Sequence, residues 1–321
     1  MAAKELPKIR AGMGDVEAPA VESWSDEDWR RATGLGKILA PDGKADRAGV
    51  PPLPPEALRD CYRTMLRIRA LGERARAAAG DEVAPVDVAA GTRGCEAAIV
   101  GAVAALEADD VVVPGRRELG AALWRGHTVA ALAAGQPVPR ALNVLPGSPY
   151  RATQLPHATG IAWAMKMQAK GQSDKADKAG KVTLAYFDRE GTSAEDFHAG
   201  LNFAAVFRVP VVFVCINDTV GGARSLETVS ETLAVKALAY GMAGVRVDGS
   251  DLFAVHAATR AAAAGARGGD GPTLIEAVVT EPGDPLDRVR TWLAGQKLLD
   301  AAAEAALRRE VDAEVAAAFK A

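Results

Sequence analysis

The stretch KVTLAYFDREGTSAEDFHAGLNFAAVFRVPVVFVCINDTV, residues 181–220, decides the fold of this chain. Residues 182–187 and 211–216 are short apolar runs rich in β-branched and aromatic side chains, which predicts two strands. Residues 193–206 carry apolar side chains at helical spacing and acidic side chains in the first turn, where the helix dipole favours them. The stretch therefore predicts a parallel βαβ unit. Ligands of such units bind at the carboxyl ends of the strands, here at residues 188–192 and 217–222.

The same alternation extends on both sides of this unit. Strands are predicted at 111–113, 244–248 and 273–279, and helices at 56–79, 94–108, 118–132, 160–170, 228–240, 252–266 and 301–319. This pattern predicts an α/β fold with a doubly wound, mainly parallel sheet flanked by helices. Residues 1–55 have few periodic apolar positions and end in a proline cluster, so we expect an N-terminal extension or arm there. Residues 56–321 then form the α/β domain with its C-terminal helix.

The composition of the chain indicates which partners and which cellular location to expect. The 321 residues have a net charge of −3 without a basic run or a basic–aromatic stripe, so no nucleic-acid partner is expected. There is no long apolar stretch and no charged-then-apolar leader, so neither a membrane partner nor a secretory signal is expected. The three cysteines, Cys61, Cys95 and Cys215, are scattered without a C-x-x-C pair, which predicts buried free thiols in a cytoplasmic protein.

Several further segments follow one another in the order of a known family. They include GCEAAIVG (94–101), ATQLPHATG (152–160), TSAEDFHAGLNFAAVF (192–207), SETLAVKALAYG (230–241) and GVRVDGSD (244–251). On these segments the chain resembles the alpha subunit of the thiamin-diphosphate-dependent dehydrogenase component of 2-oxo acid dehydrogenase complexes, most of all the branched-chain type. The resemblance implies the thiamin-diphosphate-binding fold, with thiamin diphosphate and Mg²⁺ as cofactors. It also implies oxidative decarboxylation of pyruvate or a branched-chain 2-oxo acid with lipoamide as acceptor, and a beta subunit, a homodimer or a larger complex as partners.

The metal ligands of that family have no direct counterpart in this chain. The family binds Mg²⁺ through an aspartate in a G-D-G turn and through an asparagine about thirty residues later; both supply the oxygen ligands that Mg²⁺ prefers. The T-S-x-x-D-F-H frame places the aspartate at Arg189, its flanking glycines at Asp188 and Glu190, and the asparagine at Asp218 beside Asn217. A guanidinium does not bind cations, so we expect Arg189 and Asp218 to form an ion pair in place of the metal. In the alternative alignment, a one-residue shift of the turn makes Asp188 a metal ligand, with Glu190 or Asp218 as the other.

The resemblance extends to other cofactor contacts. The family's pyrophosphate-binding tyrosine–arginine pair, followed two residues later by a histidine, falls on Arg116, Arg117 and Leu119, so only Arg117 is kept. Gln154 and His157 lie in a well-matched segment near the expected cofactor cleft. We therefore expect the cofactor site, if retained, to comprise Arg117, Gln154, His157, Asp188, Arg189, Asn217 and Asp218, with Asp188 and Asp218 as its only metal ligands.

Two family loops are also missing. Residues 135–147 replace a longer glycine-rich loop, and the loop with the family's catalytic histidine is absent after Val279. With no catalytic residue retained, the sequence predicts an impaired or inactive paralogue that acts as a structural or regulatory subunit. One alternative is an active thiamin-diphosphate- and Mg²⁺-dependent alpha subunit with a beta partner. The other is a cleft that binds a small anion through Arg116, Arg117 and Arg189. We expect oligomerisation through the small-residue helices 94–108 and 193–206.

Overall fold

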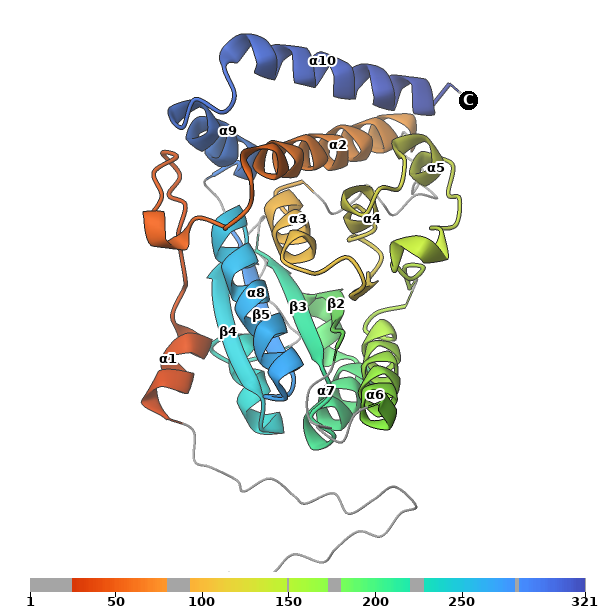
Figure 1. The fold of residues 1–321 in the computed structure, drawn as a ribbon, viewed down its shortest axis with the longest axis vertical. Helices are drawn as coiled ribbons and strands as arrows, with labels where there is room; N and C mark the ends of the chain where they lie inside the picture. Colours follow the sequence, from red (N-terminus) through yellow and green to blue (C-terminus); the bar gives the residue numbers. More distant parts are fainter. Residues whose placement is uncertain are drawn as a thin grey trace, which may run out of the picture.

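A parallel five-stranded sheet forms the centre of the computed structural model, which describes residues 25–79, 93–148, 150–172, 180–219, 228–280 and 283–320 (Figure 1). The strand order is β1-β2-β3-β5-β4, and all four neighbouring pairs are parallel. The strands are β1 (Val111–Val113), β2 (Thr183–Asp188), β3 (Val211–Asp218), β4 (Ala243–Asp248) and β5 (Thr273–Val279). Helices cover both faces of this sheet, which confirms the doubly wound α/β fold predicted from the sequence.

Helices connect successive strands, and further helices precede β1 and follow β5 along the chain. The α-helices are α1 (Asp26–Thr33), α2 (Pro55–Ala79), α3 (Glu96–Ala104), α4 (Ala121–Trp124), α5 (Val129–Ala133), α6 (Gln154–Gln172), α7 (Glu195–Val206), α8 (Leu252–Gly268), α9 (Pro285–Gly295) and α10 (Ala301–Ala318). Short 3₁₀ helices are η1 (Arg47–Gly49), η2 (Arg140–Leu142), η3 (Arg189–Ser193) and η4 (Ala234–Tyr240). None of the described helices is long and apolar enough to cross a bilayer.

Strands β1, β2, β3 and β5 divide their side chains between two apolar cores. In β3, Val212, Val214 and Ile216 belong to a core shared with α2, α3 and α8, whereas Phe213 and Cys215 belong to a core shared with α6 and α7. Successive side chains of a strand point to opposite faces, which produces this division. We call the two sides of the sheet the α8 face and the α7 face.

A buried carboxylate ties the segment before α2 to the α/β domain. Asp251 caps α8 by accepting hydrogen bonds from the N–H groups of Phe253 and Ala254. Its other carboxylate oxygen accepts from Ile38 N at 2.6 Å and Leu39 N at 2.7 Å. Helix α1 contacts β4 in addition. The described part of the predicted N-terminal arm is thus fastened to the domain, and residues 1–24 of that arm lie outside the described residues.

Helix α1 begins with a capping box, whose contribution to the stability of this helix can be tested. Ser25 Oγ accepts from Asp28 N at 3.1 Å, and the Asp28 carboxylate accepts from Ser25 N at 3.0 Å. Ser25→Ala is expected to lower the local stability of α1 by about 1 kcal/mol because the Asp28 N–H loses its acceptor. Amide hydrogen exchange of Asp28 should accelerate accordingly, whereas Ser25→Thr, which keeps a capping hydroxyl, should leave it nearly unchanged. An unaltered exchange rate in Ser25→Ala would contradict the capping role.

Several predicted helix boundaries are wrong. The predicted helix 118–132 is split into α4 and α5, because Gly126 adopts a left-handed conformation (φ 99°) and Thr128 caps a new helix by accepting from Ala131 N. The helix predicted at 228–240 is only the 3₁₀ helix η4, and the helix predicted at 94–108 ends at Ala104. Helix α9 was not predicted, although Asp284 caps it and a proline occupies its first turn.

The role predicted for residues 94–108 in oligomerisation is also wrong. Every residue of α3 is buried within the chain. Gly101 approaches α8 so closely that a Cβ there would lie 2.8 Å from the carbonyl oxygen of Leu252. The small residues of α3 serve to pack this helix against α8, because small side chains permit close approach of two helices. Helix α3 therefore offers no face to another subunit.

Candidate functional site

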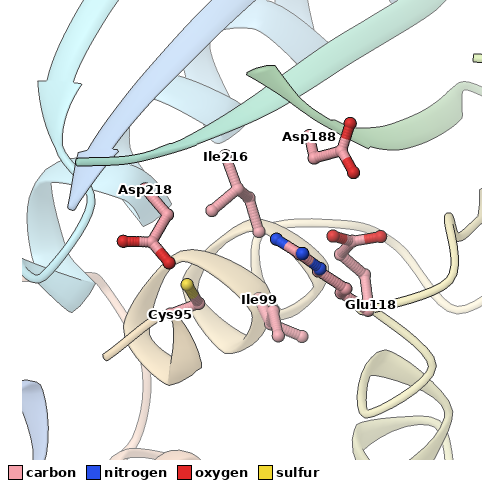
Figure 2. A pocket seen from close by; sticks show the side chains of 7 residues that line it. Cys95, Ile99, Glu118, Asp188, Ile216 and Asp218 are labelled. Atoms are coloured by element: carbon pink, nitrogen blue, oxygen red, sulfur yellow. The ribbon is translucent and has the colours of Figure 1, made fainter. Parts of the chain in front are cut away.

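A small pocket lies at the carboxyl ends of β2 and β3, on the α8 face, where the sequence predicts a ligand site. It is lined by Cys95, Ile99, Arg117, Glu118, Asp188, Ile216 and Asp218 (Figure 2). Its free volume is about 10 Å³. That is about the space that a single water molecule needs. The pocket is therefore nearly filled by its own side chains.

The register of the sheet explains why the two aspartates meet at this pocket. Asp188 pairs with Ile216 across β2 and β3, and Asp218 lies two residues further along β3. Residues two apart on a strand share a face, so Ile216 and Asp218 both face the α8 side together with Asp188. Figure 2 shows the side chain of Ile216 between the two carboxylates. The aspartates thus border one pocket but are separated by an apolar side chain.

Arg189 does not line this pocket and is not paired as predicted. Arg189 forms an ion pair with Glu190, with 3.5 Å between Nε and Oε1. The predicted ion pair between Arg189 and Asp218 is therefore wrong. Asp188 ends β2 and caps the following turn by accepting from Gly191 N at 2.9 Å. Phe187 belongs to the α7 face, so the alternation of β2 turns Asp188 toward the pocket, whereas Arg189 already begins the 3₁₀ helix η3. Asp188 therefore occupies the place in the pocket that the first alignment assigned to Arg189.

Glu118 is the site residue that sequence reasoning missed. Its side chain is almost fully buried, with 2% of the residue exposed, and it lies near Asp188 in the pocket (Figure 2). Burial, and secondarily the negative charge of Asp188, raise the pKa of Glu118 to about 7. Burial and the neighbouring Glu190 also raise the pKa of Asp188. The sequence held one signal for this residue: Glu118 is an acidic residue directly after the retained Arg117, at the start of an apolar segment.

Gln154 lies in the wall next to the pocket, whereas His157 does not reach it. Gln154 is buried; its Nε2 donates to the Tyr186 carbonyl at 2.9 Å, and its Oε1 has no hydrogen-bond partner in the described part of the chain. A Cβ at Gly115 would lie 2.6 Å from Glu118 Oε2 and 3.1 Å from Gln154 Nε2, so both side chains crowd over that glycine. His157 is exposed on α6 and is not among the pocket residues.

Asn217 is held on the opposite side of the sheet. Its Nδ2 donates to Glu276 Oε1 at 2.7 Å. Oε2 of the same buried carboxyl accepts from Leu233 N at 2.9 Å and Ala234 N at 3.0 Å. Of the residues predicted to bind the cofactor, the structure therefore brings Arg117, Asp188 and Asp218 together in the pocket. It places Asn217, Arg189 and His157 outside.

Comparison with known proteins settles the family. The family described as "Dehydrogenase E1 component" matches residues 63–280, which is more than half of the chain. The chain belongs to the dehydrogenase E1 component family. This agrees with the family resemblance noted in the sequence and with the observed fold.

Named relatives of this E1 family member come from plants and bacteria. It is 39% identical over 201 residues to 2-oxoisovalerate dehydrogenase subunit alpha 1, mitochondrial, of Arabidopsis thaliana, with 57% of this chain and 41% of the relative covered. It is 36% identical over 215 residues to pyruvate dehydrogenase E1 component subunit alpha of Staphylococcus aureus, with 62% of this chain and 56% of the relative covered. The chain spans about half the length of these relatives. Homology to alpha subunits of both the pyruvate and the branched-chain type is thus established.

In the folded chain, this pocket does not fit thiamin diphosphate. Even with Glu118 protonated, the acidic groups of Asp188 and Asp218 outnumber the single guanidinium of Arg117, so an incoming diphosphate would meet an excess of negative charge. In the described segments, no three His, Cys, Asp or Glu side chains are grouped so that they could hold a metal ion. The free volume of about 10 Å³ admits about one water molecule and no cofactor.

The pocket cysteine does not supply an alternative nucleophile. Burial, and secondarily the charge of Asp218, raise the pKa of Cys95 well above that of an ordinary thiol. The thiolate, not the thiol, is the reactive form of cysteine. Cys95 is therefore a neutral thiol at physiological pH and packs as a small apolar side chain. All three cysteines are free and buried, as predicted.

Proposed function

We propose that this chain is an alpha-type subunit of a 2-oxo acid dehydrogenase, of the pyruvate or branched-chain type, that does not carry the cofactor chemistry itself. In this role it is a structural or regulatory subunit. The observation that carries the proposal is the pocket at the ends of β2 and β3, which is small and lined by three carboxylates around a single arginine. Family membership supports the alpha-subunit part of the proposal.

The short connection after β5 supports an inactive role. The strand ends at Val279 and α9 begins at Pro285, so only residues 280–284 connect them. This is the position at which the family resemblance implies a longer loop with the catalytic histidine. Residues 134–139 likewise connect α5 to η2 where the resemblance implies a longer glycine-rich loop. A catalytic histidine from either position is therefore not expected in this chain.

One observation favours the second candidate, an active alpha subunit. Asp188 and Asp218 line the same pocket, as the shifted alignment of the turn predicts, and oxygen ligands suit Mg²⁺. In that case Arg117 is the residue left to bind the diphosphate. The anion site built from Arg116, Arg117 and Arg189 has less support, because only Arg117 lines the pocket.

The partner that we propose is a beta subunit, alone or within a larger dehydrogenase complex. Two relatives are named as alpha subunits, which supports a partner of this kind. A cytoplasmic location remains a prediction from the scattered cysteines, and the Arabidopsis relative is named as mitochondrial.

Co-expression with a beta subunit from the same organism tests the structural role. We expect the two chains to co-purify as a complex that contains no thiamin diphosphate when the denatured protein is assayed by thiochrome fluorescence. A second preparation carries Glu118→Gln and Asp218→Asn, which removes two carboxylates from the pocket and leaves Asp188 at the place of the family aspartate. Failure to co-purify would contradict the subunit role, and stoichiometric cofactor in the unmodified complex would contradict the inactive site.

A further inference from the structure

A second pocket lies on the α7 face of the sheet, between the first turn of α7 and the 3₁₀ helix η4, which contact each other. Residues from 192–198 form one of its walls and residues from 230–240 form the other, so it shares no described residue with the pocket at the ends of β2 and β3. Its free volume is about 520 Å³. That lies within the roughly 300–1,000 Å³ of pockets that bind small molecules. We call it the η4 pocket.

Three ring side chains form an aromatic wall of the η4 pocket. The rings of Phe197 and Tyr240 meet edge to face, with 6.1 Å between centroids and 73° between planes. The His198 ring lies 5.5 Å from that of Tyr240, and its Nδ1 is 3.3 Å from the phenolic oxygen. Because Phe197 is almost fully buried, its contact with Tyr240 fixes the wall against the core. Such a wall offers a ligand apolar area, with polar atoms at the edge.

Lys236 brings a positive charge to this aromatic wall. Its Nζ lies 5.8 Å from the centroid of the Phe197 ring, a distance at which the face of an aromatic ring attracts an ammonium. Burial lowers the pKa of Lys236, and no described carboxylate forms an ion pair with it. The ammonium is therefore partly withdrawn from water without an acidic partner. The carboxylate of a ligand would supply that partner through a charge-assisted hydrogen bond.

The charges of the η4 pocket suit an anion with a single negative charge. Glu195 also lines the pocket and is exposed there. A phosphate dianion would therefore meet one cation and one repelling carboxylate, whereas the single charge of a carboxylate is balanced by Lys236 alone. Ser230 adds a neutral hydroxyl at the same pocket. It accepts from Thr228 Oγ1 at 3.0 Å, so its own proton is left to donate to a ligand.

We propose that the η4 pocket binds a small monocarboxylate that carries an apolar, preferably aromatic, side chain. The ligand carboxylate accepts hydrogen bonds from Lys236 Nζ, and its apolar part lies against the wall that Phe197 and Tyr240 form. This arrangement follows the usual design of small-molecule pockets, in which apolar walls supply contact area and a few polar groups fix the orientation of the ligand. The proposal does not depend on the proposed subunit role, because the two pockets lie on opposite faces of the sheet.

Titration of phenylacetate into the full chain, followed by the amide shifts in nuclear magnetic resonance spectra, tests this binding site. We expect saturable shifts at His198 and Lys236, with a dissociation constant of about 1 mM or lower. Phenylacetamide has the same shape without the charge and should bind at least about tenfold more weakly. Inorganic phosphate should also bind more weakly than phenylacetate, because it lacks the apolar part and carries the second charge.

Charge variants of the two opposite signs should change phenylacetate binding in opposite directions. Lys236→Met should weaken it at least about tenfold, whereas Lys236→Arg, which keeps the charge, should weaken it less. Glu195→Gln should strengthen binding, because it removes a like charge from the pocket. The matched control Lys320→Met removes the same charge at an exposed position outside the pocket and should behave as the wild type.

Three outcomes would overturn the proposal. The first is the absence of saturable shifts with phenylacetate. The second is binding that Lys236→Met leaves unchanged, provided that circular dichroism shows the variant to be folded. The third is tighter binding of inorganic phosphate than of phenylacetate, which would assign the η4 pocket to a different class of anion. Because the titration needs neither a beta subunit nor thiamin diphosphate, each of these outcomes would leave the proposed subunit role intact.

Discussion

Replacement of Glu276 by alanine is expected to lower the free energy of unfolding by about 4 kcal/mol. The carboxyl is 1% exposed and accepts hydrogen bonds from Asn217 Nδ2, Leu233 N and Ala234 N. Without it, two buried N–H groups and the half-buried Asn217 amide lose their acceptor, and Arg246 loses an ion pair at 3.7 Å from Oε2. Each unsatisfied buried donor costs about 1–3 kcal/mol. Chemical denaturation followed by circular dichroism measures the change.

Glu276→Ala should also change local dynamics in a defined region. Amide exchange of Leu233 and Ala234 should accelerate more than that of the β3 core, because these two N–H groups lose their direct acceptor. The control Glu310→Ala, at an exposed position on α10, should cost less than about 0.5 kcal/mol. A loss below about 1 kcal/mol in Glu276→Ala would contradict the anchoring role, because even one unsatisfied buried donor costs that much.

Replacement of Glu118 by glutamine is expected to stabilise the protein at alkaline pH and to have little effect at acidic pH. The pKa of Glu118 is raised to about 7 in the folded protein, from an ordinary value of 4.5. The protonated form is therefore favoured by folding. The contribution of protonated Glu118 to the free energy of unfolding is fully present below pH 4.5 and is lost as the pH rises through 7. For a pKa shift of this size the loss is about 3 kcal/mol. Glutamine has no proton to lose and retains that contribution.

Unfolding free energies of wild type and Glu118→Gln between pH 4.5 and pH 8 test this linkage. The difference in favour of the variant should grow with pH to about 3 kcal/mol. A smaller decline of the same sign should remain in the variant, because the pKa of Asp188 is raised as well. Glu310→Gln serves as the control and should follow the wild-type curve. A difference that does not vary with pH would show that Glu118 is not a buried, titrating carboxyl.

The location of the site was predictable from local sequence because it depends on strand periodicity. The apolar runs at 182–187 and 211–216 correspond to β2 and β3, and parallel strands bring their carboxyl ends to the same edge. The same periodicity indicates which residue of the turn enters the pocket. Phe187 faces one core, so Asp188, the last residue of β2, faces the other side, where the pocket lies. Assigning Arg189 to the pocket followed the family alignment and overlooked the side on which Asp188 lies.

Other features depend on contacts between distant residues and could not be predicted from the sequence. The bond between Asn217 and Glu276 joins residues 59 apart, so the partner that holds Asn217 on the α7 face was not visible in the local sequence. The near absence of free volume depends on how Ile99 and Ile216 pack between the charged groups. The splitting of the predicted helix 118–132 depends on the left-handed conformation of Gly126, a conformation that glycine adopts readily but does not require.

Calorimetric titration of thiamin diphosphate with Mg²⁺ into the purified complex of this chain with its beta subunit tests the central claim most directly. The closed, acidic pocket predicts no saturable heat of binding at the alpha-chain site. The double variant Glu118→Gln with Asp218→Asn, which keeps Asp188, shows in parallel whether binding is recovered once two carboxylates are removed from the pocket. Saturable, Mg²⁺-dependent binding to the unmodified complex that is abolished by Asp188→Ala or Asp218→Ala would contradict the claim and establish an active alpha subunit.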